Sequence, residues 1–454
     1  MNYNHRTTFN WNIVFKNLFP VYRQGVFWLA LLFLAHTAQT YKTNDLMSSL
    51  TTQQKALFAH NSAKFAVDLF GILKKDSPHE NIIFSPFSIQ ACLALARIGA
   101  AGETAQELDQ GLRLISSDVA TIAESFSSVL TEYANSNLLK IVNRIYVMQG
   151  YHIRQDFQQL ANKKFLAEAE TIDFGRSEHA AAKINEWVAS KTNSLITNVV
   201  PANALTNDTR MVLLNAIHFK GQWLHKFDKE DTQDEDFYLN DSDSVRVPMM
   251  SLRARFLYST LPELDATALE MPYSNSDLSM LIILPNTRSG LQVLQDKLKN
   301  MSLSEITEKM YENRVSVKFP KFKSEFSVEL KDPLEKLGIQ RLFSSRAELG
   351  NLFDDPEPIE VSKVIHKAFI EVNEEGTEAA AATAIHVRNK RSLDTAPEHK
   401  EFIADHPFVY VVHDAIKSPS VSGEGSTLKK VVLFVGSVSV LELFSLPPLL
   451  HNEL

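Results

Sequence analysis

The sequence predicts an α+β fold within one large domain, spanning residues 41–450, and three observations lead to this prediction. Patterns typical of helices dominate the first half of the chain, whereas runs typical of strands dominate the second half. From about residue 52 onward, no clear linker interrupts the pattern. No fixed-period repeat of the solenoid kind is present. With 454 residues, 44% of them hydrophobic, the chain can bury a large core.

Individual elements are predicted from the spacing and type of the apolar residues. Apolar residues recur at helical spacing in three segments: 61–73, 88–98 and 181–194. Pro86 suits the first turn of the second of these helices, where a proline loses no hydrogen bond. β-branched and aromatic residues predict strands in five later runs: 212–219, 278–284, 314–319, 408–412 and 431–435.

Charge and composition argue against several classes of function. The net charge of −8 lacks the basic footprint of nucleic-acid binding, so we expect no nucleic-acid partner. Cys92 is the only cysteine and lies in an apolar run typical of a buried helix face, which disfavours a nucleophilic role and excludes an internal disulfide. No CxxC, HExxH or GxSxG motif is present. We therefore expect no metal, no cofactor and no enzymatic activity.

The first 40 residues have the order of a secretory signal peptide with a long leading segment. Residues 26–35 form an unbroken apolar run, which follows three basic residues and no acid. This run is too short to span about 30 Å of hydrocarbon. We place the cleavage site between Ala38 and Thr40, and a signal anchor stays the alternative. After cleavage, we expect no membrane attachment.

Further features fit the secretory pathway. Three sequons give candidate glycosylation sites: Asn207, Asn240 and Asn300. The last four residues, 451–454, read His-Asn-Glu-Leu and resemble the tetrapeptides that return proteins to the endoplasmic reticulum. If this tail is functional, the protein resides in the lumen of the endoplasmic reticulum, and otherwise it is extracellular.

Four segments, in a characteristic order between residues 55 and 443, resemble the serpin family. They are 81–88 (NIIFSPFS), 215–223 (NAIHFKGQW), 364–383 (VIHKA followed by EEGTEAAAAT) and 402–408 (FIADHPF). Each motif alone is weak, but their order and spacing together identify the chain as a member of that family. The resemblance implies three β-sheets with about nine helices. It also implies a metastable native state and an exposed reactive-centre loop at 374–400.

The resemblance assigns structural roles to individual residues. It implies a polar cluster beneath the central sheet, made of Ser85, Ser88, Asn215 and His366. Three more residues would lie near the top of the sheet, where loop insertion begins: Trp223, Lys321 and Glu374. The hinge would include Glu374, Gly376, Thr377, Ala379 and Ala381. Without the surrounding motifs, each of these polar residues would be interpreted as an ordinary core group.

The loop from Gly376 to Ser392 has the pattern that insertion into a sheet requires. Strand side chains alternate between faces, so one set must fit the core. That set is small and then apolar: Thr377, Ala379, Ala381, Thr383, Ile385 and Val387. No proline interrupts the loop. Its alanines also favour a helix by intrinsic propensity, so helical structure before insertion stays an alternative.

The basic run at 388–391 predicts the class of protease. A trypsin-like specificity pocket carries a buried carboxylate that pairs with Lys or Arg before the scissile bond. We predict the reactive bond Arg391–Ser392, because R-x-K-R is the pattern that furin-like convertases recognise. The predicted recognition residues are Arg388, Lys390 and Arg391. Family loop length counted from Gly376 gives Lys390–Arg391 as the fallback.

The sequence therefore predicts a monomeric suicide inhibitor of furin-like or trypsin-like serine proteases. The combination of signal peptide, basic loop and tail resembles the furin-directed serpins that invertebrates retain in the endoplasmic reticulum. One alternative is a non-inhibitory serpin acting as a resident chaperone or carrier. Another is a secreted inhibitor of trypsin-like clotting or immune proteases. The insertable hinge favours inhibition, because a chaperone need not keep it.

Overall fold

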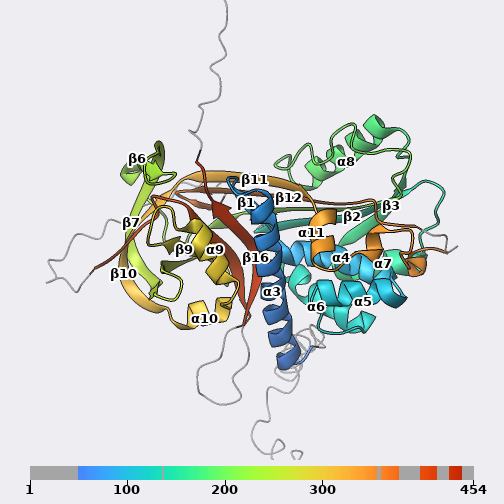
Figure 1. Ribbon diagram of the computed structural model, residues 1–454, viewed down its shortest axis with the longest axis horizontal. Coiled ribbons are helices and arrows are strands. Elements are labelled where there is room, and N and C mark those ends of the chain that lie inside the picture. The colour runs from blue at the N-terminus through green and yellow to red at the C-terminus, as the bar shows by residue number, and fades with distance from the viewer. Residues whose placement is uncertain (1–49, 135–137, 355–358, 378–398, 417–428, 442–454) are drawn as a thin grey trace, which may run out of the picture. The chain divides into compact units, whose positions relative to one another are not determined.

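The computed structural model describes residues 50–134, 138–354, 359–377, 399–416 and 429–441 (Figure 1). Within these ranges the chain forms nine α-helices: α3 (Thr52–Asp76), α4 (Pro86–Gly99), α5 (Gly102–Gly111), α6 (Val119–Ala134), α7 (Gln155–Phe165), α8 (Ser177–Lys191), α9 (Leu291–Leu298), α10 (Leu303–Glu308) and α11 (Lys331–Lys336). Three short 3₁₀ helices accompany them: η1 (Lys229–Asp231), η2 (Arg341–Phe343) and η3 (Gly350–Leu352). No helix in the described part of the chain is both long and apolar enough to cross a membrane.

The central sheet has seven strands. Six follow one another in space in the order β3 (Ala167–Ile172), β2 (Leu139–Met148), β4 (Met211–Phe219), β12 (Lys363–Asn373), β13 (Gly376–Thr377) and β5 (Gly221–Gln222). The seventh, β11 (Phe322–Glu329), pairs with β12. β4 and β12 pair in parallel from Val212 opposite Lys363 to His218 opposite Phe369, so no strand lies between them there.

The second sheet has nine strands. Eight follow the order β1 (Ile82–Phe84), β16 (Lys429–Val438), β15 (Phe408–Ile416), β9 (Leu278–Pro285), β8 (Ala266–Pro272), β7 (Ser244–Leu261), β10 (Tyr311–Pro320) and β14 (Lys400–Ile403), and β6 (Gln233–Tyr238) pairs with β7. The 18-residue strand β7 pairs with β6 and β10 and, near its end, with β8. Because β7 joins these ladders, two of the three implied sheets form one continuous sheet.

The expected elements are present, with boundaries set by local capping. All five expected strands are confirmed, as β4, β9, β10, β15 and β16. The first helix begins at Thr52, earlier than expected, because Thr51 and Gln54 form a capping box. The second begins at Pro86, with the Ser85 side chain accepting a hydrogen bond from the backbone of Ser88. The third ends at Lys191, where the Thr192 hydroxyl donates to the Val188 carbonyl.

The central sheet is covered on both faces. Every residue of β4 is buried, as expected for a strand with a packed layer on each side. Leu213 and Ile217 belong to the large core shared with α3 and α4, whereas Val212, Leu214 and Ala216 belong to a smaller cluster with Ile184 and Val188 of α8. Figure 1 shows α8 on one side of the sheet and α4 on the other. The two faces of β4 therefore pack against different helices.

Candidate functional site

A buried polar cluster links β4 to β12. His366 and Asn215 are directly opposite each other in the parallel register, and the His366 Nδ1 atom lies 2.5 Å from Asn215 Oδ1. The backbone N–H of Ser85 donates to His366 Nε2 at 3.2 Å, so Nε2 is unprotonated and Nδ1 carries the hydrogen. Burial of the ring lowers the pKa of His366 to about 3. The imidazole is therefore neutral at physiological pH.

The Asn215 amide extends this cluster to two further elements. Its Nδ2 atom donates to the Ser88 hydroxyl on α4 and, at 2.6 Å, to Asn143 Oδ1 on β2. The structure thus brings together the four residues that the sequence assigned to this place: Ser85, Ser88, Asn215 and His366. Sequence reasoning missed Asn143, although an asparagine inside an apolar strand was an available signal.

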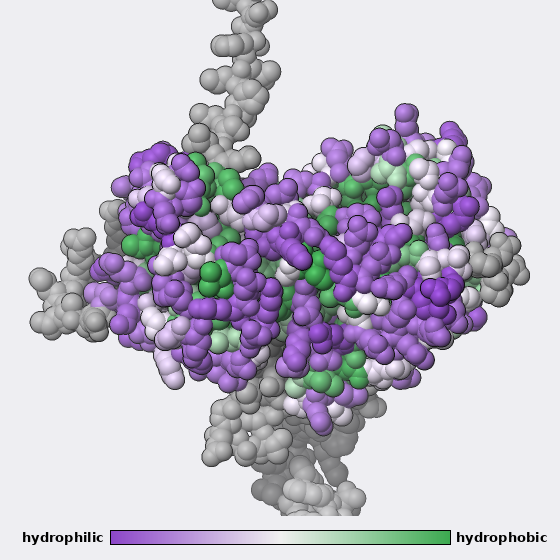
Figure 2. Space-filling view, viewed as in Figure 1, coloured by the Kyte–Doolittle hydropathy of each residue, from purple (hydrophilic) through white to green (hydrophobic). Residues whose placement is uncertain are grey.

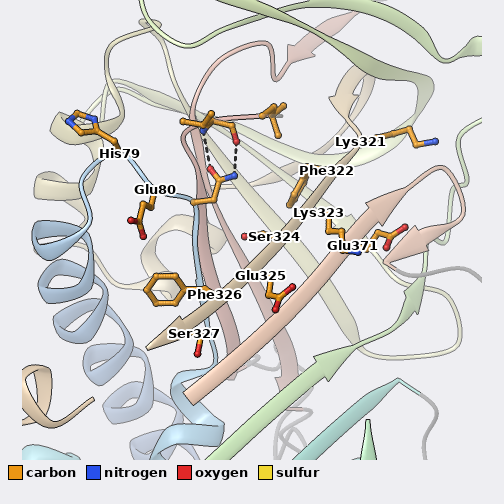
Figure 3. Close-up of a pocket in the computed structure, with 13 residues that line it drawn as sticks. His79, Glu80, Lys321, Phe322, Lys323, Ser324, Glu325, Phe326, Ser327 and Glu371 are labelled. Atoms are coloured by element: carbon orange, nitrogen blue, oxygen red, sulfur yellow. Dashed lines mark hydrogen bonds between the residues drawn. The ribbon is translucent and has the colours of Figure 1, made fainter. Parts of the chain in front are cut away.

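Near the end of β12, charged groups replace the neutral ones. The Lys321 Nζ atom lies 3.0 Å from Glu374 Oε2, and the Thr232 hydroxyl donates to Glu374 Oε1 at 2.9 Å. Burial alone would raise the pKa of Glu374, but hydrogen bonds from the backbone, Lys321 and Thr232 hold that pKa below its usual value. Figure 3 shows Lys321 at one end of a groove along β11. The neighbouring Glu375 pairs with Lys226 at 2.7 Å.

Trp223 packs over the same region. Its ring stacks on Tyr273 with centroids 4.5 Å apart and an interplanar angle of 14°. Its Nε1–H donates to the Asn373 carbonyl at 3.0 Å, and its backbone N–H donates to the Glu375 carbonyl at 2.9 Å. The backbone N–H of Phe227 donates to the Glu374 carbonyl at 3.0 Å. The turn after β12 is therefore fixed by both ring stacking and hydrogen bonds.

The beginning of the hinge is already a strand. Gly376 and Thr377 form β13, which runs antiparallel to both β12 and β5. The fully buried Thr377 has its hydroxyl 2.8 Å from that of Tyr273. Gly376 has a φ of +152°, and a Cβ there would lie 2.0 Å from the Gly221 carbonyl oxygen. No other residue fits this position without displacing β5.

Other predicted site residues lie outside the described ranges or on the surface. Ala379, Ala381 and the reactive-bond residues lie outside the described part of the chain: Arg388, Lys390, Arg391 and Ser392. The three sequon asparagines are all exposed: Asn207, Asn240 and Asn300. Their glycosylation stays a prediction.

The structure also shows whether the described residues could bind a metal ion or supply a thiol nucleophile. Among them, no three His, Cys, Asp or Glu side chains are grouped so that they could hold a metal ion. Cys92 is buried, and burial raises the pKa of its thiol to about 12. A thiol with so high a pKa is almost entirely protonated at neutral pH and is a poor nucleophile.

Comparison with known proteins defines the family. A family model described as "Serpin (serine protease inhibitor)" matches residues 60–439. "Serine protease inhibitor 42Dd" of Drosophila melanogaster is 38% identical over 351 residues, which cover 77% of this chain and 92% of that protein. Human "Serpin B4" is 38% identical over 371 residues, covering 77% and 94% respectively. The chain belongs to the serpin family.

Solved structures agree with this assignment. "Cleaved Serpin 42Da" is 52% identical, with a TM-score of 0.75, and the match covers 86% of this chain and 100% of that one. Human thyroxine-binding globulin complexed with its hormone is 26% identical, with a TM-score of 0.74, and the match covers 86% and 99%. The fold is thus the serpin fold, and the polar contacts above lie along β12 and the turn after it.

Proposed function

We propose that this chain is a suicide-type inhibitor of serine proteases that works by cleavage and insertion of its reactive loop. This proposal rests mainly on the direction of β13. β13 is antiparallel to both of its neighbours, so a chain continuing from Thr377 between β12 and β4 would be antiparallel to each. Insertion would replace one parallel ladder by two antiparallel ladders, which are slightly more stable per residue.

The chemistry of the proposed reaction is acyl transfer. The protease serine attacks the carbonyl carbon of Arg391, an ester forms, and the amino group of Ser392 leaves as a new N-terminus. The loop segment before Arg391 then inserts with the protease still esterified. Names of similar proteins support this reaction class, since several are called inhibitors of proteases, such as "Leukocyte elastase inhibitor" of pig, which is 38% identical.

We further propose a furin-like convertase as the target, with other trypsin-like proteases as the broader class. The support is the basic run at 388–391, whose arginine at 388 precedes the proposed bond by four positions. A buried acidic pocket that holds one basic residue explains cleavage after Arg391. Lys390–Arg391 stays the fallback bond.

Mixing the protein with furin, and separately with trypsin, tests this function. We expect a covalent complex that survives SDS, together with a C-terminal fragment whose mass places its new N-terminus at Ser392. A fragment that begins at Arg391 would move the bond to the fallback. Cleavage without a complex would contradict inhibition. As a specificity control, Arg388→Ala should slow the reaction with furin far more than the reaction with trypsin.

We also propose residence in the endoplasmic reticulum, because an apparent entry signal and a retrieval-like tail occur on the same chain. Deleting residues 451–454 should increase the amount of protein secreted by cells. Replacing them with four alanines is a matched control that keeps the chain length and should have the same effect. Unchanged secretion in both variants would contradict retrieval.

A carrier role is a second candidate, favoured by one cavity. This cavity of about 520 Å³ lies among α3, α9 and α10 above apolar residues of β15 and β16. The Gln295 amide lines it, is 6% exposed, and has no hydrogen-bond partner in the described part of the chain. A similar protein is titled as a thyroxine complex. A thermal shift with thyroxine that Gln295→Leu abolishes would support this role, and no shift would exclude that ligand.

A further inference from the structure

Three arginines lie close together on the exposed face of β7 and β10, where their like charges repel one another. Arg255 on β7 lies directly opposite Arg314 on β10 in the antiparallel register. Directly opposite side chains point to the same face, where like charges destabilise the pair. Arg253 lies two residues before Arg255 and therefore points to the same face. All three side chains are exposed, and we refer to them together as the arginine face.

Carboxylates offset this charge only in part. The Arg255 Nη1 atom lies 2.9 Å from Glu312 Oε2, but these side chains are 68% and 60% exposed, so the pair contributes little stability. Arg253 donates from Nε to the neutral hydroxyl of Ser316 at 2.9 Å. In the residues that the structure describes, no carboxylate lies within ion-pair distance of Arg253 or Arg314. The positive charge therefore remains available on a chain whose net charge is −8.

The arginine face adjoins the place where the chain returns from the reactive loop. β14 begins at Lys400 and runs parallel to β10, with Lys400 opposite Val315. Arg314 is the residue before Val315. An extended chain covers at most about 3.5 Å per residue, so the bond between residues 391 and 392 lies within about 30 Å of His399.

We propose that the arginine face is an exosite that binds an acidic surface of the target protease while the loop occupies its active site. This proposal rests on the proposed inhibitory function. A catalytic domain of about 300 residues has a radius of gyration of about 19 Å, so a protease seated on the loop reaches this face. Charge complementarity of this kind mainly increases the rate of association.

Neighbouring residues fit an interface. Leu257, opposite Glu312 on the same face, is 39% exposed. Arginine is among the residue types that dominate binding energies at interfaces. The edge of the molecule that contains β7 and β10 is mainly hydrophilic in the view of Figure 2, with isolated hydrophobic residues. An exposed apolar residue beside three arginines is suited to a polar protein surface.

Charge reversal at this site should slow binding without destabilising the fold. In Arg314→Glu, the opposed pair becomes attractive, so the melting temperature should stay equal or rise. The second-order rate of complex formation with furin at low salt should fall by about fivefold, and by about tenfold in the double variant Arg253→Glu/Arg314→Glu. Arg346→Glu is the matched control, because it makes the same charge change at an exposed residue outside β7 and β10. Its rate should stay within about twofold of wild type.

The salt dependence and the wild-type rate distinguish an exosite from a polyanion site and from a failure of inhibition itself. Rates of wild type and variants should converge at 1 M salt, where the screening length is about 3 Å. An unchanged rate in the double variant would overturn the exosite, and so would a rate difference that appears only when heparin is added. That second result would make the face a polyanion site. If wild type forms no complex with either furin or trypsin, the proposed function fails, and the exosite fails with it.

Discussion

The middle of β12 and the turn at its end are held by different kinds of interaction. In the middle, the His366 and Asn215 side chains are neutral and almost completely buried. In the turn after β12, the buried Glu374 pairs with Lys321, whose side chain is 28% exposed. Burying charges costs more free energy than burying hydrogen-bonded neutral groups, unless the charges are well paired. The closed part of the sheet therefore uses neutral contacts, and the ion pair occurs where one partner, Lys321, is within reach of water.

This difference indicates at which end the contacts of β12 open first. Breaking the Glu374–Lys321 pair frees a lysine that is already 28% exposed, so its loss costs less than the loss of a fully buried pair, although the Glu374 side chain is only 6% exposed. Breaking the cluster around Asn215 leaves buried polar groups without partners, at about 1–3 kcal/mol for each group. Separation that begins at the top would also begin beside β13, the strand that already occupies that end. Four predictions test this comparison, in order of decreasing effect.

Acid should destabilise the middle of the sheet most. The folded protein keeps His366 neutral until about pH 3, whereas an unfolded histidine binds a proton near pH 6.5. Between these values the unfolded state binds more protons, so the free energy of unfolding falls as the pH falls, by up to about 5 kcal/mol. Urea unfolding at several pH values measures this slope. In His366→Gln the slope should flatten, but His218 should preserve part of it, because burial lowers the pKa of His218 to about 4.

Asn215→Ala should be the most damaging single substitution among these contacts at neutral pH. It removes the partners of His366, Ser88 and Asn143 together, so we expect a loss of about 3 kcal/mol in the free energy of unfolding. Urea unfolding measures it. Asn313→Ala is the control and should cost less than about 0.5 kcal/mol, because this half-buried amide donates, among the described residues, only to the Tyr311 carbonyl. Equal losses of unfolding free energy in the two variants would show that Asn215 contributes no more than an ordinary half-buried asparagine.

Glu374→Gln should have a smaller effect on stability, about 1 kcal/mol, and a clear effect on sheet opening. A synthetic peptide with the sequence of residues 377–390 should enter the sheet faster in this variant, because the top contact is weakened. Native gel mobility follows that insertion. Glu325→Gln, at an exposed glutamate that pairs with Lys367, is the control. If both variants accept the peptide at the wild-type rate, the top contact does not limit opening.

Tyr273→Phe should have the smallest global effect. It removes one hydrogen bond to Thr377 and keeps the stacking on Trp223, so we expect a loss of about 1 kcal/mol that is confined to the hinge. Amide hydrogen exchange at Thr377 should accelerate by about fivefold. Tyr258→Phe is the control, because the Tyr258 hydroxyl makes no hydrogen bond within the described residues. Unchanged exchange in Tyr273→Phe would show that the hydroxyl pair does not hold β13.

Elements with strong periodicity could be predicted from the sequence, and their exact ends could not. The strands at 212–219 and 278–284 match β4 and β9 closely, because both are continuously buried and rich in β-branched or large apolar residues. The start of α3 depends on the capping box at Thr51, a local signal outside the apolar pattern. Joining of the sheets through β7 depends on tertiary pairing that periodicity does not encode.

The residues of the candidate site likewise divide into those that could be predicted from the sequence and those that could not. Ser85, Ser88, Asn215 and His366 were identified through motifs, and the structure brings them into contact. Tyr273 was missed, because its partner Thr377 lies 104 positions away and no local pattern links the two. Contacts between distant segments were predicted where the resemblance to the family supplied them, and the others depend on how the strands are ordered in space.

The strand order also determines what a cut in the loop does to the molecule. Every strand that the structure describes after the proposed bond belongs to the nine-stranded sheet: β14 pairs with β10, β15 lies between β16 and β9, and β16 lies between β15 and β1. In the piece that a protease separates, β14 is thus an edge strand of this sheet, whereas β15 and β16 are interior to a sheet built mostly from the other piece. The nicked protein would stay a single particle in native buffer, and only a denaturant would separate its two chains.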